Sequence, residues 1–259
     1  PGPGRRAWQG VGFLGVLTGF IILSYYSVVA GWTIRYILLA LSGGLGELAR
    51  DPAKMSGFFN AFLSDGLSQV LFHFLFMAAT TGVVIFGVKR GIERAALVLM
   101  PALFLILAGL VAYAFTTSGC AKALAFLFRA DFHNLTSGAV LEAVGHSFFT
   151  LSLGMGAMLT YGSYMQKKDS IARSAVTISV LDTTVAIMAC IVMYSIIFSV
   201  EGLRVARSST ILFSTLPTVF FKLPGGAAIS AFFYLLVAFA ALTSTVSLLE
   251  VVASYALDE

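Results

Sequence analysis

Charged residues are scarce in this chain. Lysine, arginine, aspartate and glutamate together make up 11% of its 259 residues, whereas a soluble domain carries about 25%. Hydrophobic residues make up 59% of the chain, and the mean hydropathy is +0.95. This balance excludes an ordinary soluble domain and indicates a protein that lies within the lipid bilayer.

Cysteine is nearly absent, with only Cys120 and Cys190 in the whole chain. Cys120 falls in an expected loop and Cys190 in an expected helix, so we expect neither a disulfide nor a shared metal site. Long basic runs are also missing, and the formal net charge of +4 is modest, which argues against nucleic acid as a partner. The chain begins with Pro1 and shows no cleavable signal pattern, so we expect a piece of a longer reading frame.

Long apolar runs are what the sequence does contain. Hydropathy predicts an all-α, polytopic membrane protein with a single transmembrane domain over residues 1–259. The expected spans are 11–41, 66–88, 92–115, 139–165, 171–200 and 227–257. No separate soluble domain or low-complexity segment remains between them.

The fourth span has an unusual centre. It reads GHSFFTLSLGMGAMLTYGSY over residues 145–164, with Ser152, Gly154 and Gly156 at mid-depth. A spanning helix keeps its backbone hydrogen bonds internal, because hydrocarbon offers no replacement for them. We therefore expect a helix that is broken near residues 152–156, with its freed backbone groups facing protein or water. Secondary transporters build substrate and ion sites from discontinuous helices of this kind.

The connections between spans differ in charge. The short ones are basic, and the longer ones, 42–65, 116–138 and 201–226, are mixed. The basic residues expected on the side of the short connections are Arg5, Arg6, Lys89, Arg90, Arg94, Lys167, Lys168 and Arg173. Because short loops dominate membrane orientation, we expect this side to be cytoplasmic. The apolar pieces 123–128 and 218–223 of the long connections are either short helices over an external vestibule or loops without a gating role.

The broken span resembles the sixth transmembrane helix of the neurotransmitter:sodium symporter family, of the bacterial leucine-transporter type. Further similar stretches follow in the family's order, namely Tyr25-Tyr26, 31–33, 87–94, 216–221, 223–226 and 240–244. By this resemblance the chain covers helices three to eight of a LeuT-like inverted-repeat fold and lacks helix one, which supplies half of the family's binding site. The resemblance implies a sodium-coupled amino-acid symporter that works by alternating access in a bacterial inner membrane, and not an enzyme.

An amino-acid site is implied on the same grounds. In the family, a tyrosine here represented by Tyr26 meets the substrate carboxylate, together with sodium and the amides of broken helix one. The implied substrate-binding residues are Ile22, Tyr26, Phe149, Thr150, Ser152, Gly154, Met155, Ser244 and Leu248. None is an acid or a base, which favours neutral hydrophobic or aromatic L-amino acids. The flexible thioether of Met155 is expected to leave room for bulky side chains such as that of tryptophan.

Two sodium sites are also implied. Sodium in a dehydrated site takes carbonyl, hydroxyl and carboxylate oxygens. Site one would use Thr150 and Asp182, and site two would use the carbonyl of Ala240 with the hydroxyls of Thr243 and Ser244. From the residues alone, two alternatives stay open. The hydroxyls can bond to carbonyls of their own helix, and Asp182 can pair with a segment outside this chain.

Chloride is not expected to be required. Some members of the family bind it near the first sodium site with a glutamine and a serine, and these positions read His146 and Ala186 here. The carboxylate of Asp182 would supply the compensating negative charge.

Three other function classes are alternatives to a transporter. A truncated fragment that does not transport is the main alternative, because half of the implied site is missing. An intramembrane serine protease would have to use His146 with Ser147 or Ser152, but adjacent helical residues do not face each other. A channel lacks a visible ring of charge or a filter-like carbonyl run.

Glu250, the other intramembrane acid, has two readings: it faces an aqueous inner pathway, or it pairs with a helix outside the chain. His73 is expected to be a satisfied helix residue, and His133 a solvated loop residue. Gly15 and Gly19 form a small-residue face that indicates close helix packing.

Overall fold

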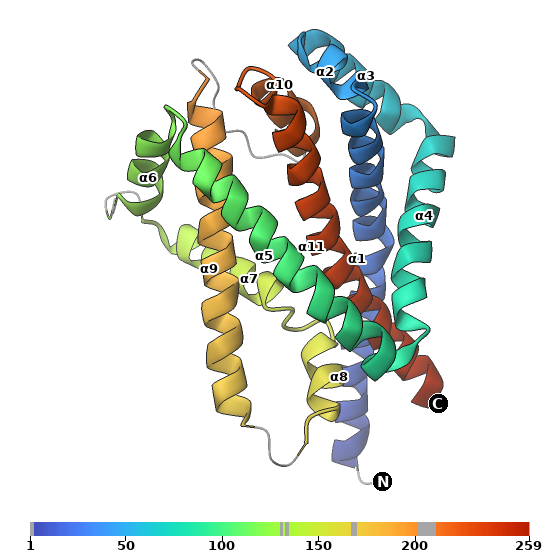
Figure 1. Cartoon of the computed structure of the whole chain (residues 1–259). Coiled ribbons are helices and arrows are strands. Elements are labelled where there is room, and N and C mark those ends of the chain that lie inside the picture. Colours follow the sequence, from blue (N-terminus) through green and yellow to red (C-terminus); the bar gives the residue numbers. More distant parts are fainter. Residues whose placement is uncertain (1–2, 130–131, 133–134, 167–169, 201–210, 259) are drawn as a thin grey trace.

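A computed structural model of the chain describes residues 3–129, 132, 135–166, 170–200 and 211–258. Within these ranges the chain forms only helices and turns (Figure 1). Five of the described helices are long and apolar enough to cross a membrane. They are α1 (Pro3–Leu41), α4 (Gly66–Val84), α5 (Glu93–Phe115), α9 (Ile171–Phe198) and α11 (Gly226–Asp258). The remaining expected span consists of α7 (Ser137–Thr150) and α8 (Ala157–Ser163) with a break between them, which confirms the predicted all-α class with one broken helix.

Four shorter helices lie at one end of the bundle, the upper end in Figure 1. They are α2 (Gly44–Ala49), α3 (Pro52–Ser64), α6 (Cys120–Phe128) and α10 (Leu216–Phe220). The link between α4 and α5 and the two chain ends lie at the opposite end (Figure 1). The apolar piece 123–128 is thus part of α6, and 218–223 begins within α10. The expected loop position of Cys120 is wrong, because this residue begins α6.

Not every predicted connection can be compared with the structure. Lys167, Lys168 and Asp169 of the short basic connection, His133 and residues 201–210 all lie outside the described residues. The α4–α5 link does lie inside them, and it differs from the expected loop. α4 ends at Val84, Gly87 has a left-handed φ of 72°, and Val88–Ile92 forms a π-helical turn that leads into α5. Glycine adopts a left-handed φ without a steric cost, so Gly87 allows the chain to reverse here.

Local capping explains where several helices begin. Asp51 precedes Pro52, the first residue of α3, and accepts a hydrogen bond from the amide of Ala53 at 2.9 Å. Asp65 caps α4 in the same way. It accepts hydrogen bonds from the hydroxyl of Ser68 at 2.5 Å and from the Ser68 amide at 3.3 Å. These two bonds hold the pKa of the Asp65 carboxyl below its usual range.

The main core lies where α1, α10 and α11 meet near the upper end. Tyr36 and Tyr234 are fully buried around Phe213, and their rings pack at centroid distances of 5.0–6.1 Å. Both tyrosine hydroxyls are satisfied, because Tyr36 donates to the carbonyl of Phe213 at 2.5 Å and Tyr234 to that of Leu212 at 2.6 Å. Buried aromatic residues with bonded hydroxyls fix this end of the bundle as a rigid frame.

Polar side chains join α1, α4 and α11 lower in the bundle. His73 Nδ1 lies 3.1 Å from the Ser27 hydroxyl, which confirms the expected satisfied histidine. Thr80 of α4 and Thr245 of α11 share a buried hydroxyl pair at 2.9 Å. Because a buried polar group costs free energy unless it is bonded, these pairs specify how the three helices are aligned.

Candidate functional site

The break between α7 and α8 is built from left-handed backbone. Ser152, Gly154 and Gly156 have φ values of 54°, 81° and 81°. Among the described residues, Ser152 alone combines a side chain with a positive φ. A left-handed conformation costs a residue with a Cβ about 1–2 kcal/mol. Strain of this kind is typical of ligand sites, where the surrounding structure enforces it.

The backbone around the break is only partly bonded. The amide of Leu151 still reaches the Ser147 carbonyl at 3.1 Å, and the Leu153 amide reaches back five residues to Phe148 at 2.8 Å. Regular bonding resumes when the Thr160 amide donates to the Gly156 carbonyl at 3.0 Å. Within the described residues, the amides of Gly154 and Met155 have no such partner. A membrane protein tolerates free amides only beside a cavity, a ligand or further protein.

An apolar cluster gathers at the break. Met155 is 6% exposed and packs with Leu23 of α1 and Leu248 of α11, and Ile22 lies against the same cluster. Ile22, Met155 and Leu248 come from three separate elements, and all three belong to the predicted side-chain pocket. The structure therefore brings these three residues together.

A polar pair lies one turn above this cluster. Tyr26 of α1 is half-buried, and its hydroxyl interacts with the Ser244 side chain of α11. Ser244 is exposed although it lies in the middle of a membrane-spanning helix. Tyr26 and Ala240 also line a cavity of about 310 Å³ together with Val185 of α9. Tyr26, the predicted partner of the substrate carboxylate, thus shares one cavity with Ala240 of the predicted sodium site two.

Two hydroxyls of α11 lie within hydrogen-bond distance of the same carbonyl oxygen. Thr243 Oγ1 donates to the Ala240 carbonyl at 2.8 Å, and Ser244 Oγ donates to the same carbonyl at 3.2 Å. This back-bonding is the alternative left open for these hydroxyls. It also holds three neutral oxygens in one place, and a hard cation such as sodium prefers oxygens of this kind.

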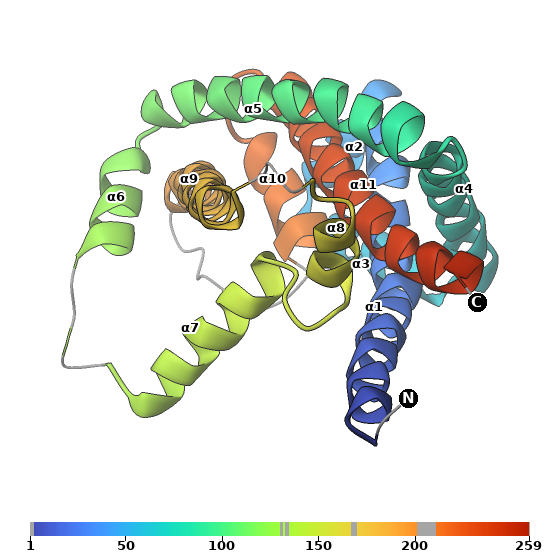
Figure 2. The same cartoon turned by 90° about the horizontal axis from the view of Figure 1, so that it is seen from below.

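The remaining predicted site residues are not brought together. Every residue of α7 is exposed, and this helix makes only slight contact with the others. Figure 2 shows α7 running outward from the bundle. Phe149 and Thr150 lie at its inner end, where the Thr150 hydroxyl bonds to the Ser147 carbonyl at 3.3 Å. Asp182 is half-buried on α9 and forms no hydrogen bond or ion pair with a described residue, so the described residues do not assemble sodium site one.

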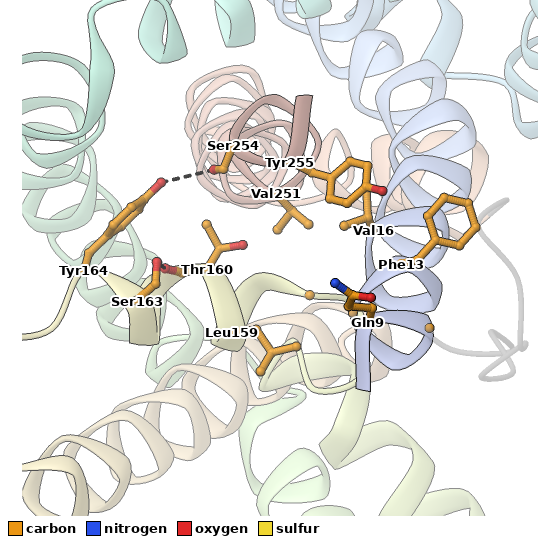
Figure 3. A pocket seen from close by; sticks show the side chains of 13 residues that line it. Gln9, Phe13, Val16, Leu159, Thr160, Ser163, Tyr164, Val251, Ser254 and Tyr255 are labelled. Carbon is orange, nitrogen blue, oxygen red and sulfur yellow. Dashed lines mark hydrogen bonds between the residues drawn. The ribbon is translucent and has the colours of Figure 1, made fainter. Parts of the chain in front are cut away.

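Sequence reasoning missed a polar network below the break. Tyr164, the residue that caps the end of α8, donates to the Glu250 carboxylate of α11 at 2.6 Å. Its hydroxyl also lies 3.1 Å from the Ser254 hydroxyl (Figure 3). Tyr161 donates to the Ser247 hydroxyl at 2.8 Å. Glu250 is 7% exposed and pairs inside the chain with Tyr164, a partner that neither expectation named. The signal was present, because Tyr161 and Tyr164 have the same three-residue spacing as Ser247 and Glu250.

A cavity of about 730 Å³ lies beside this network (Figure 3). It is lined by α1, α8 and α11, with Phe13, Thr160 and Val251 among its residues, and Gly156 connects it to the break. The break thus has an apolar cluster on one side and a cavity toward the lower end of the bundle on the other.

The Tyr164–Glu250 bond is expected to stabilise the docking of α8 on α11. In the complete protein, Tyr164→Phe should lower stability by about 1.5–3 kcal/mol, because a buried carboxylate loses its donor. Glu250→Met should act similarly, and the double variant should be little worse than the more severe single variant. The measurement is the thermal unfolding midpoint in detergent. Additive losses in the double variant would show that the two side chains do not interact.

The chain is similar in sequence to known proteins over most of its length. The sequence pattern of the sodium:neurotransmitter symporter family matches residues 62–259. The chain is 38% identical over 248 residues to YhdH, an uncharacterized sodium-dependent transporter of Bacillus subtilis (strain 168). The matched region covers 96% of this chain and 54% of that protein. It is 31% identical over 251 residues to an uncharacterized sodium-dependent transporter of Haemophilus influenzae, covering 95% of this chain and 54% of the relative.

The fold is similar to a solved structure, the crystal structure of MhsT in complex with L-phenylalanine. The TM-score is 0.86 at 40% sequence identity, over 97% of this chain and 57% of that one. The chain therefore spans about half the length of the curated relatives that it matches.

Proposed function

Because the chain belongs to the sodium:neurotransmitter symporter family, we propose that it forms part of the binding site in a sodium-coupled symporter for neutral hydrophobic or aromatic L-amino acids. The family is one of sodium-dependent transporters and not of enzymes, so the protease alternative is excluded. The observation that carries the proposal is the cluster of Ile22, Met155 and Leu248 at the helix break, directly beside the Tyr26–Ser244 pair.

The chemistry of this arrangement supports the substrate class. An amino acid needs polar partners at its α-carbon and a fitting environment for its side chain. Tyr26 and Ser244 offer hydroxyls at one end, and the apolar cluster offers only hydrocarbon and a thioether at the other. A charged substrate side chain would be desolvated there without a partner, which is costly. The similar structure of MhsT contains L-phenylalanine, which is a neutral aromatic amino acid.

Sodium is proposed to bind as a co-transported ion. The Ala240 carbonyl and the Thr243 and Ser244 hydroxyls would supply oxygens for one ion, and Thr150 with Asp182 would supply oxygens for a second. Each set needs further ligands, which the family resemblance assigns to helix one, outside this chain. For site one, α7 would also have to pack toward α9.

Alternating access is proposed to use the broken helix. Ser152, Gly154 and Gly156 permit α7 and α8 to change their relative direction without disrupting regular helix hydrogen bonds. The frame formed by α1, α4 and α11 is tied together by the Ser27–His73 and Thr80–Thr245 pairs. Binding of substrate and sodium at the break would shift the population between outward and inward states.

The membrane orientation follows from the charged links. The α4–α5 link and the N-terminus lie at one end of the bundle (Figure 1). We propose that this end faces the cytoplasm of a bacterial cell, because its short links are the basic ones. His146 and Ala186 stand where chloride-binding members carry glutamine and serine, so we also propose that chloride is not required.

Uptake by proteoliposomes tests this function. The gene extended to its natural ends is reconstituted, and accumulation of radiolabelled leucine and tryptophan is measured under an inward gradient of sodium or potassium. We expect accumulation with sodium only, and the same accumulation when chloride is replaced by gluconate. The 259 residues alone are expected to be inactive, because helix one is missing from them.

Each outcome has a separate meaning. Uptake that is indifferent to sodium would refute the coupling and both ion sites while leaving the fold. Stimulation by chloride would refute only the chloride proposal. Sodium-driven uptake of charged amino acids in place of leucine and tryptophan would refute the proposed substrate class.

A further inference from the structure

The small-residue face of α1 packs directly against the helix break. Gly15 and Gly19 are both buried. A Cβ placed on Gly15 would lie 3.2 Å from the amide nitrogen and 3.3 Å from the Cα of Gly156. A Cβ on Gly19 would lie 3.1 Å from the carbonyl oxygen of Met155. These neighbours are backbone atoms, which cannot rotate away as the end of a side chain can, so any side chain added here must shift the break itself.

Gly19 is also adjacent to the apolar cluster. The same Cβ would lie 3.9 Å from Leu248 Cδ2 and 3.8 Å from Val251 Cγ1. Ile22, the α1 member of the cluster, lies three residues further along the same helix and so on the same face. Gly19 therefore lies at the edge of the apolar cluster that contains Ile22, Met155 and Leu248.

Gly15 has a different neighbour. It faces Gly156, which has a left-handed φ of 81° and begins the turn into α8. A methyl group at Gly15 therefore displaces the start of α8, not the side-chain cluster. Substitutions at the two glycines therefore differ in what they displace: a methyl group at Gly15 shifts the start of α8, and one at Gly19 shifts the Met155 carbonyl.

We propose that Gly19 determines substrate size: because it has no side chain, the Met155 backbone lies close to α1 and leaves the proposed pocket wide enough for aromatic substrates. This inference rests on the proposed function. With a methyl group at this position, the Met155 carbonyl has to move by a few tenths of an ångström away from Gly19, which shifts Met155 within the cluster that it forms with Leu248 and Ile22. A closely packed cluster cannot absorb that shift freely, so the pocket becomes smaller. Large substrates then lose more affinity than small ones.

The test compares substrates of different size in the complete transporter. Half-saturating concentrations are measured for tryptophan, leucine and alanine under a sodium gradient, for the parent protein and for Gly19→Ala. We expect the tryptophan value to rise about tenfold or more relative to the alanine value, since one methylene in an apolar pocket is worth about 10–200-fold. Gly15→Ala should affect all substrates alike. Gly109→Ala, in the middle of α5 with nothing within 4 Å of an added Cβ, should leave the ratio unchanged.

A second variant protects the test from a folding defect. Leu248→Ala in the Gly19→Ala background removes the neighbouring methyl groups and should restore the relative affinity for tryptophan. An unchanged tryptophan-to-alanine ratio in Gly19→Ala, or a double variant that folds but regains nothing, overturns the inference. A parent protein without sodium-driven uptake of any amino acid refutes the proposed function instead, and the inference with it.

Discussion

Asp182→Ala is expected to remove most of the sodium-driven amino-acid uptake. Loss of outer ligands alone costs a metal site about 10–100-fold in affinity, so loss of a direct carboxylate ligand should cost at least as much. We expect uptake at physiological sodium to fall by about 100-fold, with the residual activity shifted to higher sodium concentrations. The measurement is initial uptake by proteoliposomes over a range of sodium concentrations.

The environment of Asp182 is the reason for this expectation. The residue is half-buried in the middle of α9, within an apolar stretch, and pairs with no described residue. An unpaired carboxylate at membrane depth is unfavourable by about 2.5–3.5 kcal/mol or more. Either a cation or a basic group from the rest of the polypeptide must therefore compensate for it in the complete protein.

Three variants distinguish these two partners. Asp182→Asn keeps an oxygen ligand without the charge, so sodium affinity should fall less than in Asp182→Ala. Glu47→Gln removes one negative charge from the exposed surface of α2 and should change nothing. If Asp182 serves only as a partner for a distant basic residue, Asp182→Ala will lower thermal stability but leave the half-saturating sodium concentration unchanged.

The fold was predictable because its elements follow from local rules. An apolar run longer than a bilayer is thick indicates a span, and Ser152, Gly154 and Gly156 within one such run indicate a break. The structure places this break between Thr150 and Ala157. The π-helical turn at Val88–Ile92 and the start of α6 at Cys120 were not predicted. Both depend on how the chain packs after it leaves the membrane, which hydropathy does not encode.

The site was less predictable, because its contacts join residues far apart in the chain. Tyr164 and Glu250 are separated by 86 positions, and only their matched spacing with Tyr161 and Ser247 indicated a pairing. Gly15 and Gly19 predicted close packing, but the sequence alone did not identify the break as their partner. The residue types thus indicated which helix faces pack closely, and the structure identified what they pack against.

Thr243→Val is the second substitution for which a large loss is expected. Valine has nearly the shape of threonine but lacks the hydroxyl, so packing is kept while one proposed sodium ligand is removed. We expect sodium-driven uptake to fall by about 10–100-fold, by the same reasoning on metal ligands. Thr243→Ser keeps the oxygen and should stay within a few-fold of the parent protein. The measurement is again the half-saturating sodium concentration in proteoliposomes.

The control is a threonine that also bonds to a carbonyl of its own helix but has no proposed ion. Thr18 of α1 donates to the Leu14 carbonyl at 2.8 Å, the distance found between Thr243 and Ala240. If the Thr243 hydroxyl does no more than bond to its own helix, Thr243→Val and Thr18→Val will have the same small effect, because helices lose little when such a bond is removed. A large loss in Thr243→Val alone assigns its oxygen to sodium. The back-bond to Ala240 then positions that oxygen for the ion.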